Sequence, residues 1–141
     1  RQQIIFKNKN FMVINDSKST SYSSSAEMLK RNVNIYWLVG GIPKLGDKFN
    51  LSKDNFKNIK AYIFGGYQKK FYFDLKNKIT SKKFSDLSKA LNEIFKDIKK
   101  DYTPKKIILF SPAAASFDSF KNFEKRGEYF DKLIKEYIYA K

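Results

Sequence analysis

The sequence contains no cysteine and no histidine among its 141 residues. Without cysteine it can form no disulfide, thiolate metal site or cysteine nucleophile. Without histidine it lacks the usual general base, the Ser-His-Asp arrangement and the commonest zinc ligand. No apolar run approaches the roughly 18 residues that indicate a membrane span. We therefore expect no independent acid–base catalysis, no bound metal and no membrane contact.

Arginine is also scarce, since only Arg1, Arg31 and Arg126 occur among the 29 basic residues. The formal net charge of +15 would suit a nucleic-acid-binding surface. Base and phosphate recognition usually recruits arginine, however, and the lysines here are scattered among Asn, Ile, Phe and Tyr. We interpret them as a solvated surface and predict no nucleic-acid binding. A non-enzymatic nucleotide- or RNA-binding α/β module stays open as an alternative on charge alone.

Strand and helix signals alternate along the chain. The expected strands are Ile35–Val39 and Ala61–Phe64, each followed by a glycine pair, and a hairpin made of Ile4–Phe6 and Phe11–Ile14. The first expected helix begins at Ser23–Glu27, with an acid in its first turn, and lasts to about Arg31. The second runs from about Phe84 to Lys99, and the last begins within Ser111–Gly127. Such alternation favours a mainly parallel sheet covered by helices. We predict one α/β, Rossmann-like three-layer domain with an N-terminal hairpin.

Four loops follow the expected strands, at residues 15–20, 40–44, 65–66 and 111–116. The carboxyl ends of parallel strands lie along one edge of a sheet, so these loops should share a crevice. The last loop consists of small residues between a strand and a helix start, which would let an anion approach backbone N–H groups. An ordinary strand-to-helix connection is the alternative interpretation of the same spacing.

Two segments carry a family resemblance. Asn15–Thr20 reads NDSKST, and Ser111–Gly127 reads SPAAASFDSFKNFEKRG. Together they resemble the C-terminal domain of the Mur ligases, and the similarity runs from Arg1 to about Tyr137. The first segment indicates only the superfamily, whereas the second, with many residue types in fixed register, is most similar to the D-glutamate-adding branch. Another Mur ligase or a folylpolyglutamate-type ligase is the runner-up.

The resemblance implies an ATP- and Mg²⁺-dependent acid–D-amino-acid ligase in cytoplasmic peptidoglycan synthesis. Such an enzyme activates UDP-N-acetylmuramoyl-L-alanine as an acyl-phosphate and joins it to D-glutamate. No GxxxxGK(S/T) sequence occurs here. We therefore expect the UDP-binding and central ATP-binding domains to lie outside this chain. The chain alone should be inactive, and the enzyme should be a monomer.

The resemblance also assigns roles to individual residues. Lys18 would lie close to the reacting carboxylates as the catalytic lysine. Asp16 would contact the nucleotide ribose, since a carboxylate accepts hydrogen bonds from vicinal hydroxyls. Arg1 would reach the nucleotide phosphates. Ser21 departs from the family pattern, in which Asn is frequent.

The remaining assignments concern D-glutamate. Lys44 would pair with its side-chain carboxylate, and the Thr20 hydroxyl would assist. Ser116 and the backbone N–H of Phe123 would hold the α-carboxylate, and the Phe123 ring is expected in the core. Many relatives carry an acid between the glycine pair and the lysine that matches Lys44, whereas this chain has Ile42-Pro43 there.

Overall fold

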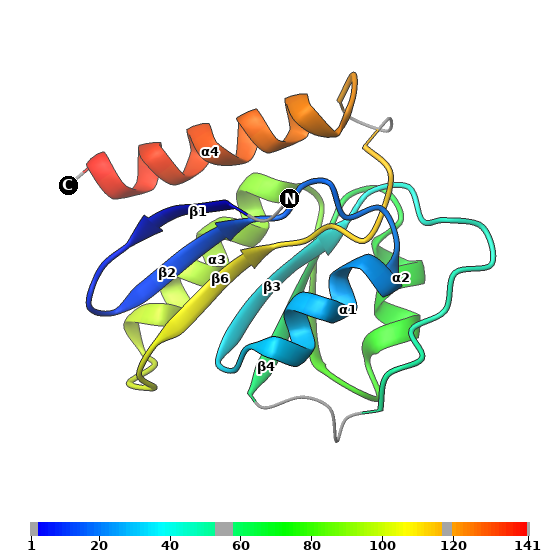
Figure 1. Cartoon of the computed structure of the whole chain (residues 1–141), viewed down its shortest axis with the longest axis horizontal. Helices are drawn as coiled ribbons and strands as arrows, with labels where there is room; N and C mark the ends of the chain where they lie inside the picture. The colour runs from blue at the N-terminus through cyan, green and yellow to red at the C-terminus, as the bar shows by residue number, and fades with distance from the viewer. Residues whose placement is uncertain (1–2, 53–57, 117–119, 141) are drawn as a thin grey trace.

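The computed structural model describes residues 3–52, 58–116 and 120–140, which form six strands and four helices (Figure 1). In chain order these are β1 (Gln3–Lys7), β2 (Phe11–Asn15), α1 (Tyr22–Arg31), β3 (Ile35–Gly40), β4 (Ile59–Phe64), α2 (Gln68–Leu75), β5 (Thr80–Phe84), α3 (Leu87–Lys99), β6 (Lys106–Phe110) and α4 (Phe123–Tyr139). Arg1 lies outside the described residues.

One six-stranded sheet has the order β1-β2-β6-β3-β4-β5. β1 pairs antiparallel with β2, so that Ile4 lies opposite Ile14, and every other neighbouring pair is parallel. Helices cover both faces. The predicted three-layer α/β domain, its mainly parallel sheet and its N-terminal hairpin are therefore confirmed.

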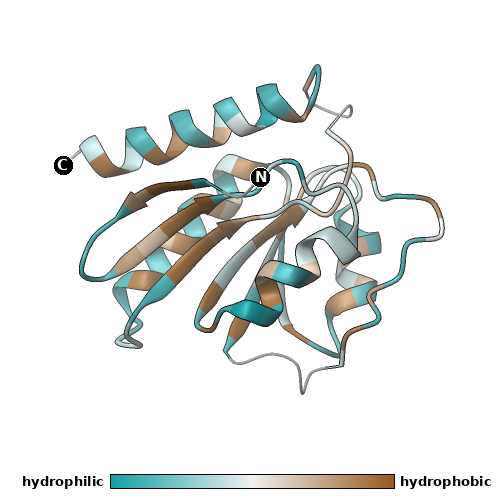
Figure 2. Cartoon of the chain, viewed as in Figure 1, coloured by the Kyte–Doolittle hydropathy of each residue, from teal (hydrophilic) through white to brown (hydrophobic). Residues whose placement is uncertain are grey.

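Two hydrophobic clusters hold the layers together. Leu29 of α1 and Phe71 of α2 pack on one face of the sheet around Trp37. α3 and α4 pack on the other face, where Phe130 stacks on Phe110 at 4.4 Å between ring centroids. The central strands β3 and β6 are buried along their whole length, which explains the apolar runs Ile35–Val39 and Ile107–Phe110 within them. Figure 2 shows the largely apolar strands at the centre of the domain and helices in which polar and apolar residues alternate.

The connections diverge at one point of the sheet. From β2 the chain crosses through α1 on one face, whereas from β6 it continues to α4 on the other face. β2 and β6 are neighbours. Loops that leave adjacent parallel strands toward opposite faces open a crevice at the strand carboxyl ends, where α/β proteins bind ligands.

Several predicted boundaries were wrong. Phe84 ends β5 instead of opening a helix, and α3 begins at Leu87 after its N-cap Asp86, which accepts a hydrogen bond from Lys89 N. The N-cap of α1 is Ser21, so Glu27 lies beyond the first turn. The strand β5 and the helix α2 were not predicted. The sequence of β5, TSKKF, is polar because this strand forms an exposed edge of the sheet.

No helix within the described residues is both long and apolar enough to span a bilayer.

Candidate functional site

The loop that follows β6 is joined by backbone hydrogen bonds to the segments on either side of it. On the β2 side, Asp16 N donates to Phe110 O at 2.7 Å. On the β3 side, Gly40 N donates to Pro112 O at 3.0 Å, and Ile42 and Ala115 exchange bonds of 3.0 and 2.9 Å. Gly41 permits this approach, because a Cβ there would lie 2.5 Å from Ala115 O and its φ is +125°. The predicted convergence of these three loops is confirmed.

Buried hydroxyl groups also connect the loop after β2 with the loop after β6. Ser111 Oγ donates to Asp16 Oδ2 at 2.8 Å, and Ser25 Oγ lies 2.7 Å from Ser111 Oγ and 2.5 Å from Ser19 Oγ. Because the Ser111 proton is directed to Asp16, Ser25 donates toward Ser111 and Ser19 donates toward Ser25. Ser19 Oγ accepts in turn from the backbone N–H of Ala113 at 3.2 Å. The chain of hydroxyls thus runs between two candidate loops and ends on a carboxylate.

Arg126, in the first turns of α4, bridges two of these loops. It is 1% exposed, and its Nη1 donates to Ala114 O while Nη2 donates to Ser17 O, each at 2.8 Å. The next residue, Gly127, lets α4 approach the loop after β2, since a Cβ there would lie 2.4 Å from Ser17 Oγ. Asn15 completes the junction by donating to Gly127 O at 3.1 Å and to Asp131 Oδ1 at 2.8 Å.

The carboxylate of Asp16 faces inward. The residue is 4% exposed, and burial raises the pKa of its carboxyl group, although the Ser111 hydrogen bond opposes this effect. An ionised Asp16 is therefore held in place by a donor within the protein. Its predicted contact with a ribose stays a prediction.

Lys18 and Phe123 line one small cavity of about 210 Å³ between the loop after β2 and the start of α4. Lys18 is exposed. Phe123 is only partly buried and belongs to neither hydrophobic cluster, so the expectation that its ring is core was wrong. As the first residue of α4 it follows the N-cap Asn122. Its backbone N–H is one of those that a helix leaves without an intrahelical partner.

The other predicted residues lie on the joined loops. Ser116 follows Ala115 and is 2% exposed. Lys44 is exposed in the loop after β3, beyond the paired residue Ile42, and Thr20 is exposed next to Ser19. The fourth predicted loop also reaches this edge, since Gly65 and Gly41 line a common cavity of about 280 Å³ with Arg126. The individual binding roles of these side chains stay predictions.

One feature of the loop after β6 differs from the expected pattern. α4 begins only at Phe123, so the small residues 111–116 do not lead directly into a helix start. They instead pair with the loop after β3, and Ala113 adopts a left-handed φ of 59°. A non-glycine residue in this conformation is strained by roughly 1–2 kcal/mol, as is frequent at functional sites.

No group of three or more metal-ligating side chains occurs within the described parts of the chain.

Sequence reasoning missed Arg126, Ser25 and Ser111 as organisers of the site. Arg126 looked like one charge on an amphipathic helix, and Ser25 looked like a capping residue. The scarcity of arginine in a lysine-rich chain was the available signal, because a buried bidentate donor is a role that lysine fills poorly.

The fold is an α/β domain whose loops are joined at the carboxyl ends of its parallel strands. No family model matches the chain. It is, however, 41% identical to the UDP-N-acetylmuramoylalanine–D-glutamate ligase of Rickettsia prowazekii over 137 residues, which are 97% of this chain and 31% of that protein. The ligase of the same name from Agrobacterium fabrum is 36% identical over 130 residues, 92% of this chain and 28% of that protein.

The chain thus spans about 30% of the length of these relatives, and it matches their C-terminal part. We identify it as a homologue of the C-terminal domain of the Mur ligases. Within that family its relatives are the UDP-N-acetylmuramoylalanine–D-glutamate ligases. The resemblance carried by the two sequence segments is confirmed.

Proposed function

We propose that this chain is the D-glutamate-binding and nucleotide-clamping domain of an ATP-dependent ligase of peptidoglycan synthesis. The whole enzyme would join D-glutamate to UDP-N-acetylmuramoyl-L-alanine through an acyl-phosphate, in the cytoplasm and as a monomer. The observation that carries the proposal is the identity of 41% across nearly the whole chain to a ligase of that name. The joined loops support it, because they hold the segments that bear Asp16, Thr20, Lys44 and Ser116 at one edge of the sheet.

Recognition of D-glutamate follows from the chemistry of its two carboxylates. The exposed ammonium group of Lys44 would pair with the side-chain carboxylate, with the Thr20 hydroxyl donating a second bond. Ser116 and the backbone N–H of Phe123 would donate to the α-carboxylate. The N-terminal end of α4 carries a partial positive charge that favours this anion.

The reacting carboxylate groups would be stabilised by Lys18, which is exposed on the loop after β2. A positive charge near the developing negative charge of the reaction lowers the barrier without any proton transfer. Mg²⁺ and most of the ATP would be held outside this chain, since its sequence contains no GxxxxGK(S/T) phosphate-binding loop. The chain alone should therefore neither hydrolyse ATP nor form the amide bond.

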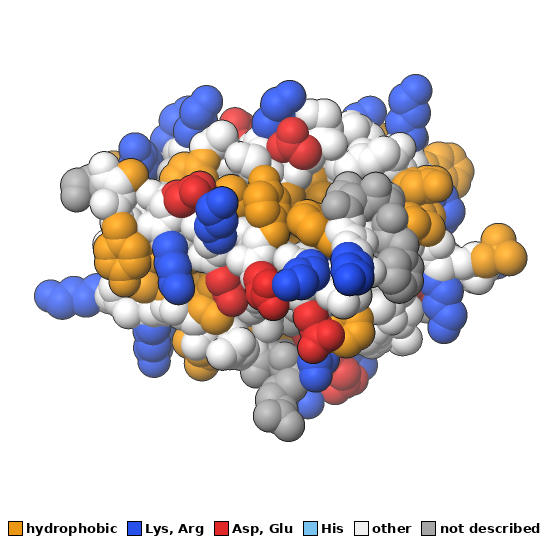
Figure 3. All heavy atoms as spheres, turned by 90° about the horizontal axis from the view of Figure 1, so that it is seen from above, with side chains coloured by type: hydrophobic (Ala, Val, Ile, Leu, Met, Phe, Trp, Pro, Cys, Tyr) orange, Lys and Arg blue, Asp and Glu red, His pale blue; other side chains and the backbone are white. Residues whose placement is uncertain are grey.

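The proposal includes no nucleic-acid-binding site, and the charges on the α4 face agree with this. On the face that carries α4, lysines alternate with acids and apolar side chains (Figure 3), which is not the continuous basic stripe of a nucleic-acid-binding face. A ligase that uses another amino acid is the remaining alternative, and comparing D-glutamate with L-glutamate as substrate separates the two.

Steady-state kinetics of the full-length enzyme, with D-glutamate and ATP both varied, test the assignment. A hydrogen bond to a charged group contributes about 1.5–3 kcal/mol and a neutral one about 0.5–1.5 kcal/mol. Lys44→Ala should therefore raise the KM for D-glutamate more than Thr20→Ala does, with the KM for ATP nearly unchanged. Asp16→Ala should chiefly raise the KM for ATP.

Lys48→Ala is the matched control, because Lys48 is an exposed lysine of the same loop. An unchanged D-glutamate KM and kcat/KM in Lys44→Ala would contradict the assignment of the site.

A further inference from the structure

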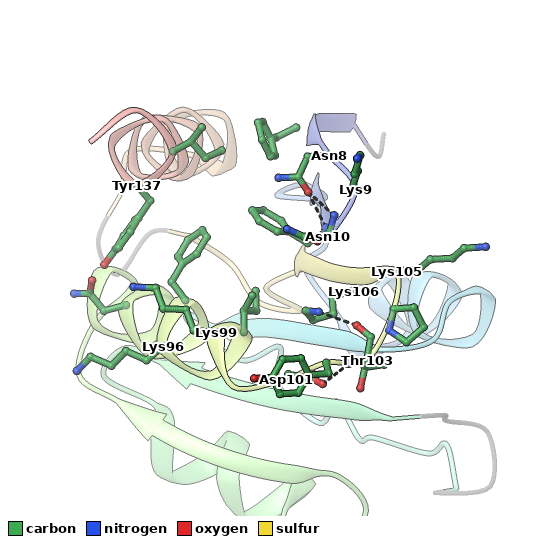
Figure 4. Close-up of a pocket in the computed structure, with 18 residues that line it drawn as sticks. Asn8, Lys9, Asn10, Lys96, Lys99, Asp101, Thr103, Lys105, Lys106 and Tyr137 are labelled. Carbon is green, nitrogen blue, oxygen red and sulfur yellow. Dashed lines mark hydrogen bonds between the residues drawn. The ribbon is translucent and has the colours of Figure 1, made fainter. Parts of the chain in front are cut away.

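A second groove lies at the opposite end of the sheet from the candidate site. It has a volume of about 870 Å³ and is bordered by the β1–β2 turn, the C-terminal half of α3, the segment that leads into β6 and the end of α4 (Figure 4). These elements meet at the amino ends of β2 and β6. A ligand in this groove would therefore leave the loops at the strand carboxyl ends accessible.

The floor of the groove is apolar and largely aromatic. Phe6 and Phe11 lie 5.5 Å apart, Phe11 meets Phe95 edge-on at 5.9 Å, and Phe95 stacks on Tyr137 at 4.6 Å between ring centroids. All four side chains are only partly buried. Because the rings already pack against one another, they offer an apolar surface for aliphatic side chains more than open faces for stacking bases.

The rim is basic. Lys9, Lys96, Lys99 and Lys105 line the groove and are exposed, and Figure 4 shows Lys96 and Lys105 extending outward from opposite sides. Among the described residues, the ion pairs of the chain involve other lysines and arginines. None of these four lysines therefore forms an ion pair within the described structure.

The one acid that lines the groove is already engaged. Asp101 accepts hydrogen bonds from Thr103 N, at 2.9 Å, and from the hydroxyl of Tyr36. Lys106 is likewise turned inward and donates to Thr103 O at 2.7 Å. At the edge, Tyr102 is 95% exposed, and tyrosine is enriched at the centres of protein interfaces.

We propose that this groove binds an acidic segment of a partner protein whose apolar side chains lie on the aromatic floor. Carboxylates of the segment would meet the rim lysines, and this charge complementarity selects the partner and accelerates its association. Apolar side chains would cover the parts of these rings that stay exposed. Single-stranded nucleic acid fits less well, because it requires open ring faces and usually recruits arginine.

The test uses the full-length protein and a fluorescein-labelled peptide in which glutamate alternates with leucine. The same peptide with glutamine in place of glutamate, and a labelled oligothymidine, serve as alternative probes. Fluorescence anisotropy then compares the double variant Lys96→Glu/Lys99→Glu with Lys69→Glu/Lys76→Glu. The second pair makes the same change of charge at exposed positions in and just after α2, on the other face of the sheet.

We expect the glutamate peptide to bind, and the groove variant to lose about tenfold or more in affinity while the α2 variant stays close to the parent protein. Binding should weaken as salt shortens the screening length from about 10 Å at 0.1 M toward about 3 Å at 1 M. Retained ligase kcat in both variants verifies that they fold. Equal losses in the two variants, equal binding of the glutamine peptide, or tighter binding of oligothymidine would each overturn the proposal.

Discussion

Replacing Arg126 by lysine removes the bridge between two candidate loops while the positive charge stays in place. The guanidinium donates to Ala114 O and Ser17 O at 2.8 Å from two different nitrogens. An ammonium group is a point charge on a flexible stem and cannot reproduce this planar fork. One of the two carbonyls should therefore lose its charged donor in a buried environment.

The size of the effect follows from the bond that is lost. A hydrogen bond to a charged group contributes about 1.5–3 kcal/mol, which corresponds to roughly 12- to 150-fold in the unfolding equilibrium constant. The free energy of unfolding should fall by that amount. The side chain is 1% exposed, so water cannot readily replace the missing donor.

Urea unfolding measures this loss, and the chain contains its own probe. Trp37 is the only tryptophan of the sequence, is fully buried, and donates from its indole nitrogen to Ser111 O at 2.7 Å. Its fluorescence therefore reports on the loops in question. The midpoint should shift while the slope of free energy against urea stays constant.

Arg31→Lys provides the matched control. This substitution makes the same chemical change at a surface position. The Arg31 side chain is 67% exposed and pairs with Glu27 at 3.5 Å. Exposed ion pairs of this kind contribute about 0.3–0.5 kcal/mol, so the control should unfold almost like the parent. If Arg126→Lys and Arg31→Lys unfolded at the same urea concentration, the bridging role inferred for Arg126 would be refuted.

Three further changes test other parts of the structure. Ser111→Ala should cost about 1.5–3 kcal/mol of stability and raise the pKa of Asp16 further, since the carboxylate loses its hydroxyl donor; Ser23→Ala, at an exposed position, should change neither. Hydrogen bonds from Thr103 and Tyr36 outweigh burial and lower the pKa of Asp101 to about 2. The ionised Asp101 therefore stabilises the fold at pH values above the unfolded-state pKa of about 3.9, and this stabilisation is lost as pH falls toward 2. In urea titrations, Asp101→Asn should be less stable than the parent protein at neutral pH, and the two unfolding midpoints should converge in acid. Phe123→Ala should cost well below the roughly 3–5 kcal/mol of a buried phenylalanine, in contrast to Phe130→Ala at a fully buried site; equal losses would contradict the partly exposed position of Phe123.

The fold could be predicted wherever one residue pattern had one structural explanation. Ile35–Val39 is continuously apolar because β3 is central and covered on both faces, and the alternation of elements implied a parallel sheet. β5 gave no such signal, because an exposed edge strand needs no apolar face. Phe84 was assigned to the following helix since its spacing to Leu87 and Leu91 is helical, although it stacks on Tyr62 across the neighbouring strand at 6.2 Å.

The candidate site was predictable at the level of loops and not at the level of contacts. The parallel sheet brings the loops to one edge, and that follows from strand order. The direction of each side chain depends on tertiary packing. Asp16, for example, points inward to Ser111 across 95 positions of sequence. Phe123 appeared to continue the apolar stripe of α4, yet it lies in the first turn, where the helix extends past the hydrophobic cluster.

The way the loops are joined bears on how this domain would close over its ligands. The loop after β6 shares backbone hydrogen bonds with its neighbours on both sides, and Arg126 fastens two loops to α4. Moving any one loop alone would break several buried bonds at once, each worth about 1 kcal/mol or more. Closure by independent loop movement is therefore unfavourable. We expect the three loops to move together as one rigid body.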